Sequence, residues 1–215
     1  MSTLKLFFGG SFDPIHLGHL TSAERLLEIT QAQDITLLPN ALSPLKSRQH
    51  IPPHQRKQLL ELALQQYPNL KLDWREVERG GHSFTSDTLQ ELSLQYPNNP
   101  IGFVMGLDSF NYLDRWHNWQ QLSDYAHLIV IARPGYQLHM SKPLKQWLNA
   151  RLCHNVAELD QSKAGKVYFC ELQPMDISSS KIRENIASQV NLHTLEDMLP
   201  ADLISYIVQH KLYGA

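Results

Sequence analysis

The chain has 215 residues, of which 42% are hydrophobic and 19% are charged, a length and composition typical of one globular domain or at most two small ones. Nineteen basic and 21 acidic side chains give a formal net charge of −2, which excludes the broad basic surface of many nucleic-acid-binding proteins. Two cysteines are too few for a disulfide framework, and no apolar run approaches the roughly 18 residues of a membrane span. We therefore expect a single cytoplasmic domain over residues 1–215. We expect it to bind neither nucleic acid nor membranes.

Short β-rich runs alternate with helical patterns along the chain, which is typical of βα units around a parallel sheet. In chain order, we expect a strand at 4–8, a helix through 20–30, a strand at 34–38, a helix from Pro52-Pro53 to 66, a strand at 70–74, a helix at 85–96, strands at 101–105, 127–132 and 167–172, and helices at 179–188 and 200–210. The irregular segment 134–165 gives no prediction. The alternation indicates a Rossmann-like α/β fold, a doubly wound and mainly parallel sheet with helices on both faces.

Ligands of such a sheet bind outside the carboxyl ends of its strands, near the point where the strand order reverses. The segments that follow the predicted strands are therefore the first places to look for chemistry. They are 9–19, 39–46, 106–108, 133–134 and 175–183, and the chemically capable residues of the chain cluster in them.

The first of these segments reads Gly9-Gly10-Ser11-Phe12-Asp13-Pro14-Ile15-His16-Leu17-Gly18-His19. Two glycines after a strand allow backbone N–H groups to approach a ligand without a Cβ in the way. The following helix directs its free N–H groups to the same place, and His16 and His19 add donors suited to phosphate oxygens. A plain turn is the alternative, and two histidines alone make a weak zinc site, so we expect no metal ligated by protein side chains. Asp13, which precedes a proline, is interpreted as a turn residue.

A second motif, Ile177-Ser178-Ser179-Ser180-Lys181-Ile182-Arg183, follows the last predicted strand. Three hydroxyl groups at the start of a helix can simply cap it. Lys181 and Arg183, however, add two cations to the same N-terminal turn, where they oppose the helix dipole and an anion would relieve the conflict. The segment therefore predicts a contact with a polyphosphate.

The two motifs resemble the His-x-Gly-His and Ile-Ser-Ser-x-x-Ile-Arg signatures of the nucleotidyltransferase superfamily. Other stretches are similar to the nicotinate-nucleotide adenylyltransferases in particular: Leu37-Leu38-Pro39-Asn40, Ser83-Phe84-Thr85-Ser86-Asp87-Thr88-Leu89, Gly106-Leu107-Asp108-Ser109 and Arg133-Pro134-Gly135. The resemblance covers the chain from Phe8 to Tyr213. It implies transfer of the AMP moiety of ATP to nicotinate mononucleotide, which gives nicotinate adenine dinucleotide and pyrophosphate in NAD biosynthesis.

The resemblance also implies roles for residues at matching positions. The implied catalytic residues are His16, His19, Lys46 and Arg183, with the two histidines stabilising charge on the α-phosphate. The implied ATP site consists of Gly9, Gly10, Ser11, Phe12, His16, His19, Gly106, Asp108, Ile177, Ser178, Ser179, Ser180 and Arg183. The implied nicotinate mononucleotide site consists of Asn40, Lys46, Ser83, Phe84, Thr85, Trp116 and Arg133, with Trp116 stacked on the pyridine ring.

The sequence departs from the family pattern at three of these places. Leu45 stands before Lys46 where a histidine is usual, Phe84 replaces a common tyrosine, and Ser180 replaces a threonine. The last change preserves a hydroxyl group, whereas the loss of the tyrosine hydroxyl at Phe84 can alter the grip on the substrate.

The implied reaction needs no general base, because the attacking phosphate monoester is already mostly dianionic at pH 7. Catalysis then consists of placing two anions in line and neutralising charge, with Mg²⁺ bound through the ATP phosphates. Two alternatives stay open: a sibling enzyme that acts on nicotinamide mononucleotide or phosphopantetheine, and a non-catalytic ATP-binding regulator. The sequence leaves the oligomeric state undecided.

Overall fold

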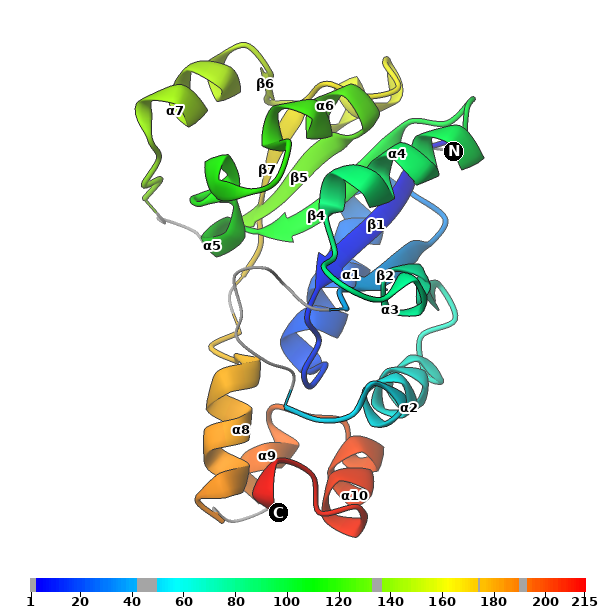
Figure 1. Cartoon of the computed structure of the whole chain (residues 1–215), viewed down its shortest axis with the longest axis vertical. Helices are drawn as coiled ribbons and strands as arrows, with labels where there is room; N and C mark the ends of the chain where they lie inside the picture. Colours follow the sequence, from blue (N-terminus) through cyan, green and yellow to red (C-terminus); the bar gives the residue numbers. More distant parts are fainter. Residues whose placement is uncertain (1–2, 42–49, 133–136, 174, 190–192) are drawn as a thin grey trace.

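The computed structural model describes residues 3–41, 50–132, 137–173, 175–189 and 193–215. Its centre is a seven-stranded sheet with the strand order β3-β2-β1-β4-β5-β7-β6, in which every neighbouring pair is parallel (Figure 1). The strands are β1 (Lys5–Gly10), β2 (Ile35–Pro39), β3 (Leu70–Leu72), β4 (Ile101–Gly106), β5 (His127–Ala132), β6 (Leu152–Cys153) and β7 (Val167–Glu171). The order reverses between β1 and β4, so ligands are expected at the carboxyl ends of these two strands.

The helices of the described residues are α1 (Leu17–Thr30), α2 (Pro53–Leu64), α3 (Arg75–Arg79), α4 (Thr85–Gln95), α5 (Leu107–Phe110), α6 (Leu122–Tyr125), α7 (Lys142–Asn149), α8 (Ser179–Ala187), α9 (His193–Glu196) and α10 (Ala201–Gln209). Four 3-10 turns complete them: η1 (Leu113–Arg115), η2 (Trp119–Gln121), η3 (Val156–Asp160) and η4 (Leu212–Gly214). None of these helices is long and apolar enough to cross a membrane.

Helices cover both faces of the sheet, and each face has its own hydrophobic core. Successive side chains of a strand point to opposite faces, so Leu6 and Phe8 enter the core that continues into buried residues of α1, α2, α8 and α10. Phe7 enters the other core, with buried residues of α4, α5, α6 and α7. The same alternation divides Val104 from Phe103 and Met105 in β4. This two-sided burial explains why the strands read as nearly continuous apolar runs, and it confirms the predicted doubly wound fold.

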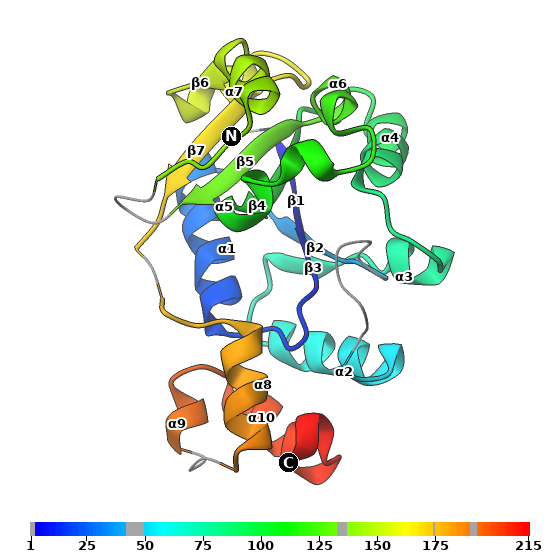
Figure 2. The same cartoon turned by 60° about the vertical axis from the view of Figure 1, so that its left-hand side comes forward.

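The C-terminal helices form a group of their own beyond the carboxyl ends of the strands. Figures 1 and 2 both place α8, α9 and α10 there, with α2 beside them and the C-terminus among them. The N-terminus lies at the opposite end of the sheet. The end of the chain is thereby brought to the edge of the sheet where ligands are expected.

The main strands and helices agree with the sequence-based expectations, but the short elements α3, α5, α6, α7, α9 and β6 and the 3-10 turns were not predicted. The strand expected at 70–74 ends at Leu72, and α3 follows it. Part of the segment 134–165 is also ordered, because Ser141 accepts a hydrogen bond from the Leu144 N–H and caps α7, and β6 extends the sheet edge.

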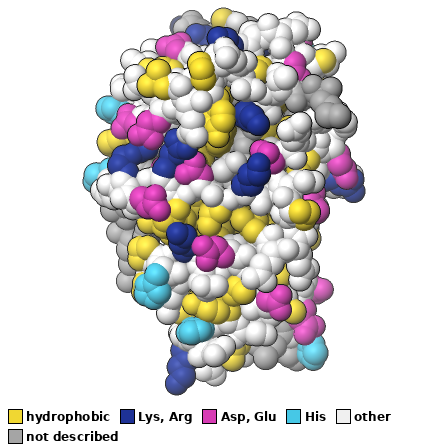
Figure 3. All heavy atoms as spheres, turned by 90° about the vertical axis from the view of Figure 1, so that its right-hand side faces the viewer, with side chains coloured by type: hydrophobic (Ala, Val, Ile, Leu, Met, Phe, Trp, Pro, Cys, Tyr) yellow, Lys and Arg dark blue, Asp and Glu magenta, His cyan; other side chains and the backbone are white. Residues whose placement is uncertain are grey.

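Charges of both signs are interspersed on the face of the molecule shown in Figure 3, with apolar groups between them. This face carries no large field of one sign, in agreement with the small net charge of the chain.

Candidate active site

A large cavity opens at the carboxyl ends of β1 and β4, where the strand order reverses. Its volume is about 1410 Å³, more than the usual 300–1,000 Å³ or so of a site for one small ligand. Its wall is built from the segments after β1, β2 and β4, from the starts of α4 and α8, and from the segment around Trp116. One space therefore contains both residue sets that the sequence singled out.

Gly9 and Gly10 line this cavity, and no side chain fits at either position. A Cβ on Gly9 would lie 2.4 Å from Cζ of Phe103, and a Cβ on Gly10 would lie 2.8 Å from Cζ of Phe12. Both contacts are shorter than real Cβ atoms tolerate. The absence of side chains at the end of β1 is thus required by packing against two phenylalanine rings, and it also leaves the backbone open to a ligand.

His16 and His19 lie at the start of α1 and form a stacked pair. Their ring centroids are 3.7 Å apart with an interplanar angle of 26°, and the His19 ring also packs against Phe12 at 4.9 Å. A Cβ on Gly18 would lie 3.1 Å from Nδ1 of His16, so the glycine between the histidines leaves room for the first imidazole. The His-x-Gly-His spacing is therefore a packing requirement of the pair.

His16 is 5% exposed, and its burial lowers the pKa of the imidazole to about 4. The ring is therefore neutral at pH 7. Its Nδ1 is covered by protein and has no hydrogen-bond partner among the described residues. Nε2 is the ring nitrogen that remains available to a ligand in the cavity.

The polar groups of the Ile177–Arg183 motif hold the loop that precedes the histidines. The Ser179 hydroxyl donates to the Pro14 carbonyl at 2.9 Å, and Nη1 of Arg183 donates to the Asp13 carbonyl at 2.6 Å. Ser178 accepts from the Lys181 N–H and caps α8. Ser178 therefore both caps α8 and lies at the cavity wall. The Ile177–Arg183 motif also holds the loop of the Gly9–His19 motif in place.

A second polar connection joins β2 to the loop before α4. The Ser83 hydroxyl accepts a hydrogen bond from the Ala41 N–H at 2.8 Å and is also hydrogen-bonded to the Glu76 carboxylate. Burial raises the pKa of Glu76. The oxygen of Ser83 is thus used to hold two walls of the cavity together.

Aromatic rings form the part of the cavity next to this loop. Phe84 lies against His117 with centroids 4.5 Å apart, and Trp116 follows the short η1 turn. Nε1 of Trp116 is buried without a hydrogen-bond partner among the described residues. Flat apolar surfaces of this kind suit the face of an aromatic ligand.

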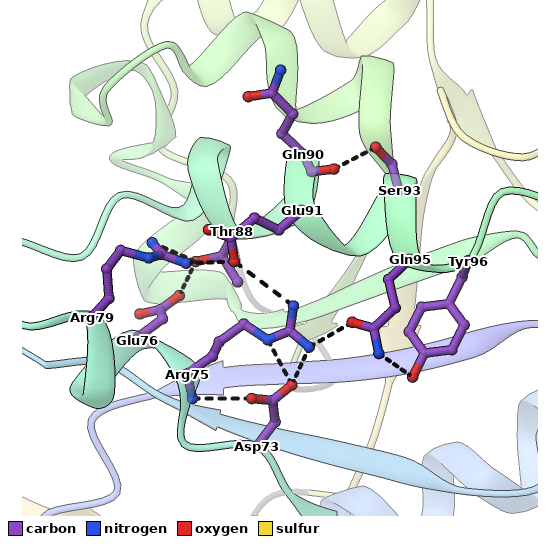
Figure 4. Close-up of polar contacts among 10 residues, drawn as sticks. All are labelled: Asp73, Arg75, Glu76, Arg79, Thr88, Gln90, Glu91, Ser93, Gln95 and Tyr96. Atoms are coloured by element: carbon purple, nitrogen blue, oxygen red, sulfur yellow. Dashed lines mark hydrogen bonds and ion pairs between the residues drawn. The ribbon is translucent and has the colours of Figure 1, made fainter.

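A network of charged and polar side chains joins α3 to α4, the helix that follows Ser83 and Phe84 (Figure 4). Arg79 contacts Glu91 at 2.8 Å and the Thr88 hydroxyl at 3.3 Å, while Thr88 donates to the Glu76 carboxylate at 2.8 Å. Arg75 adds contacts to Asp73, Gln95 and Glu91.

Arg56 in α2 is a component of the site that the sequence analysis missed. Its side chain is 1% exposed and donates to the Ser11 carbonyl at 3.1 Å and the Asn40 carbonyl at 2.5 Å, and its guanidinium lies over the Trp74 ring. Burial lowers its pKa, an effect that nearby Asp13 opposes. Arg56 therefore ties the ends of β1 and β2 together.

Most residues proposed from the sequence line the cavity. Phe12 does not, because its side chain is 1% exposed and packs behind Gly10. Lys46 and Arg133 lie outside the described residues, as does Leu45. The predicted residues that do line the cavity are Gly9, Gly10, Ser11, His16, His19, Asn40, Ser83, Phe84, Thr85, Gly106, Asp108, Trp116, Ile177, Ser178, Ser179, Ser180 and Arg183.

Metal-ligating side chains are not grouped in this site. Within the described part of the chain, no three His, Cys, Asp or Glu side chains come close enough to hold a metal ion. A cation that acts here would have to bring ligands from elsewhere, such as phosphate oxygens.

Comparison with known proteins gives matches that span the chain. The cytidylyltransferase-like family matches residues 7–185. The "Nicotinate-nucleotide adenylyltransferase" of Escherichia coli O6:H1 (strain CFT073) is 39% identical over 215 residues, which cover 99% of this chain and 100% of that protein.

Solved structures are similar in fold at low identity. The Plasmodium falciparum nicotinic acid mononucleotide adenylyltransferase complexed with NaAD has a TM-score of 0.74 and 19% identity, covering 98% of this chain and 97% of that one. The same Plasmodium enzyme complexed with APC has a TM-score of 0.71 and 18% identity, covering 98% and 96%.

Proposed function

Because the chain belongs to the cytidylyltransferase-like family and, within it, to the nicotinate-nucleotide adenylyltransferases, we propose that it transfers the AMP moiety of ATP to nicotinate mononucleotide. The products are nicotinate adenine dinucleotide and pyrophosphate, a step of NAD biosynthesis. The observation that carries this proposal is the single cavity of about 1410 Å³ that contains the histidine pair at one wall and the Ser83–Trp116 surfaces at another. Such a cavity has room for two nucleotides that must meet.

The chemistry is a displacement at the α-phosphorus of ATP. An oxygen of the nicotinate mononucleotide phosphate forms the new P–O bond, and the bond between the α-phosphorus and the bridging oxygen breaks as pyrophosphate leaves with that electron pair. The attacking phosphate is mostly dianionic at pH 7, so no side chain has to remove a proton. The protein contributes alignment of the reacting atoms and donors for the charge that develops.

His16, His19 and the backbone after β1 supply these donors. The start of α1 and the segment around Gly9 and Gly10 line the same space, and a helix N-terminus favours phosphate. Among the first N–H groups of α1, that of Leu17 donates to the Met198 carbonyl and that of His19 to the His16 carbonyl. Neutral His16 can donate from Nε2 without placing a positive charge against the stacked His19 ring. Residues of the α8 start, together with Gly106 and Asp108, would hold the rest of ATP.

Trp116 and Phe84 would accommodate the pyridine ring, and Asn40 and Thr85 would contact the rest of the mononucleotide. Lys46 and Arg133 remain predicted contributors to phosphate binding, although they lie outside the described residues.

Mg²⁺ is proposed to enter with ATP, bound to its phosphate oxygens. The described residues offer no cage of side chains for it, which suits an ion that keeps substrate oxygens and water as its ligands. Its part is to neutralise charge on the leaving pyrophosphate. A cytoplasmic location stays a prediction from the sequence.

The test is pyrophosphate release from ATP and Mg²⁺ with nicotinate mononucleotide, nicotinamide mononucleotide and phosphopantetheine in parallel reactions. A strong preference for nicotinate mononucleotide, with a dinucleotide product, supports the proposal. Release with another acceptor alone assigns the protein to a sibling activity. ATP binding without release in any reaction would instead identify an ATP-binding regulator.

A further inference from the structure

The end of the chain reaches the base of the loop that carries the histidine pair. In the η4 turn, the Tyr213 hydroxyl donates a hydrogen bond to Oδ1 of Asp13 at 2.7 Å. Leu212 beside it is 4% exposed in the hydrophobic core, and Gly214 lies against Ala187 of α8. The tail is therefore packed in place, and it presents one polar atom to a residue 200 positions away.

Asp13 is the centre of the contacts that shape this loop. It is 5% exposed, and its second carboxylate oxygen accepts the His50 N–H at 3.2 Å. The neighbouring carbonyls are held by three side chains from helices: Arg56 on Ser11, Arg183 on Asp13 itself and Ser179 on Pro14. Asp13 itself lines the cavity and precedes His16 by only three residues, so its carboxylate lies in the loop that leads directly into α1.

We propose that Tyr213 is a positioning residue for the adenylyl transfer: its hydroxyl fixes the Asp13 carboxylate and thereby sets the place of His16 and His19 at the cavity. This inference rests on the proposed function, and it adds the C-terminal turn to the parts of the chain on which the reaction depends. Tyr213 does not line the cavity, so it acts through Asp13.

A neutral hydroxyl suits this place for an electrostatic reason. Arg56 and Arg183 already lie near the Asp13 carboxylate, and a third cation would repel them. A phenol satisfies the remaining acceptor without adding charge, and its rigid ring is anchored by the packing of its neighbours. The pair thus holds the loop without competing for the phosphate that the cations attract.

The experiment compares Tyr213→Phe with Tyr206→Phe, which removes a hydroxyl from α10 in the same C-terminal region. We expect Tyr213→Phe to lower kcat about tenfold while KM for ATP stays within about threefold, because misplacement of reacting groups affects turnover more than binding. Tyr206→Phe should match the wild type. Hydrogen exchange of the backbone at residues 9–19 should accelerate in Tyr213→Phe and stay unchanged at β4.

Asp13→Asn supplies the second arm. If Tyr213 acts through Asp13, adding Tyr213→Phe to Asp13→Asn should change kcat by less than about twofold, since interacting sites are non-additive. Full additivity, wild-type kcat in Tyr213→Phe, or unchanged exchange at residues 9–19 would overturn the inference. If Tyr213→Phe does not fold, hydrogen exchange of the backbone at residues 9–19 in Asp13→Asn replaces it. Faster exchange there supports the inference, and unchanged exchange overturns it. An inactive wild type would refute the proposed function alone, because the exchange readout needs no turnover.

Discussion

The imidazole rings of His16 and His19 stack with their centroids 3.7 Å apart, and Gly18 between them leaves the space that this stack requires. Two protonated imidazoles at this distance would repel each other. Burial avoids that conflict by keeping the pKa of His16 near 4, so one ring of the pair is neutral at pH 7. The pair therefore offers directed N–H donors to a phosphate without a costly accumulation of like charge.

Replacing either histidine should lower turnover far more than it weakens the binding of ATP. We expect His16→Ala and His19→Ala each to lower kcat by about 10²–10³-fold, the usual cost of losing an oriented donor to transition-state charge. Isothermal titration with ATP should still detect binding, because other parts of the cavity are also proposed to contact ATP. A variant that keeps wild-type pyrophosphate release would remove the histidine pair from the mechanism.

Gly18→Ala tests the packing of the pair without touching a donor. The new Cβ would lie 3.1 Å from Nδ1 and 3.2 Å from Cε1 of His16, so the ring must move by a few tenths of an ångström. We expect kcat to fall about tenfold or more. The melting temperature should hold, because alanine is the better helix former by up to about 1 kcal/mol. Thr21→Ala, on the exposed side of α1, is the control, and equal activity of the two variants would contradict the argument.

The meeting of the two motifs at one cavity was predictable because their signals are local. The glycines at the end of β1, the histidine spacing and the serines at the start of α8 each lie in one short segment. Arg56 was missed although a signal existed: it shares a helical face with Leu59, Leu60 and Ala63 and is the one charged residue among them.

Contacts between distant segments left no comparable signal. The Tyr213–Asp13 bond joins residues 200 positions apart, and nothing in the spacing of either residue indicates the other. The α7 helix is an intermediate case, because the Ser141 cap followed by Lys142-Pro143 and by apolar Leu144, Trp147 and Leu148 at helical spacing could have predicted it. Short elements in irregular segments are hard to recognise from periodicity because they complete barely two turns.

Arg56→Met should both destabilise the protein and slow the reaction. The change leaves the buried Ser11 and Asn40 carbonyls without the guanidinium that bridges them. Hydrogen bonds from a charged donor contribute about 1.5–3 kcal/mol each, so we expect a loss of roughly 3 kcal/mol in the free energy of unfolding. Urea unfolding measures it.

Lys57→Met is the matched control for Arg56→Met, since it removes a neighbouring cation that is only partly buried. It should change the free energy of unfolding by less than about 0.5 kcal/mol. Equal stabilities of the two variants would show that the bridge between β1 and β2 contributes nothing measurable.

Ser83→Ala should affect the mononucleotide more than ATP. The hydroxyl accepts from the Ala41 N–H and contacts Glu76, so its loss leaves a backbone donor unpaired and frees the loop before α4. We expect KM for nicotinate mononucleotide to rise several-fold, with KM for ATP nearly unchanged. Ser205→Ala, an exposed change in α10, controls for the loss of a hydroxyl. A larger rise in KM for ATP would place Ser83 on the other side of the cavity.

The stability of the ligand-free protein should fall in mild acid because of His16. Its folded pKa is about 4, below the unfolded value of 6.5, so between these pH values the unfolded chain binds a proton that the folded chain does not. The stabilising contribution is therefore complete above about pH 6.5 and declines by about 1.4 kcal/mol per pH unit as the pH falls toward 4. Burial lowers the pKa of His127 as well, so that residue adds to the trend in the same direction.

Urea unfolding between pH 8 and pH 5 measures this effect. The free energy of unfolding should decline less steeply for His16→Asn than for the wild type, by up to one fewer proton taken up on unfolding. His54→Asn, at an exposed position, should follow the wild type. Identical slopes for the wild type and His16→Asn would mean that His16 titrates equally in the folded and unfolded states, and that the neutral ring assigned to the histidine pair is wrong.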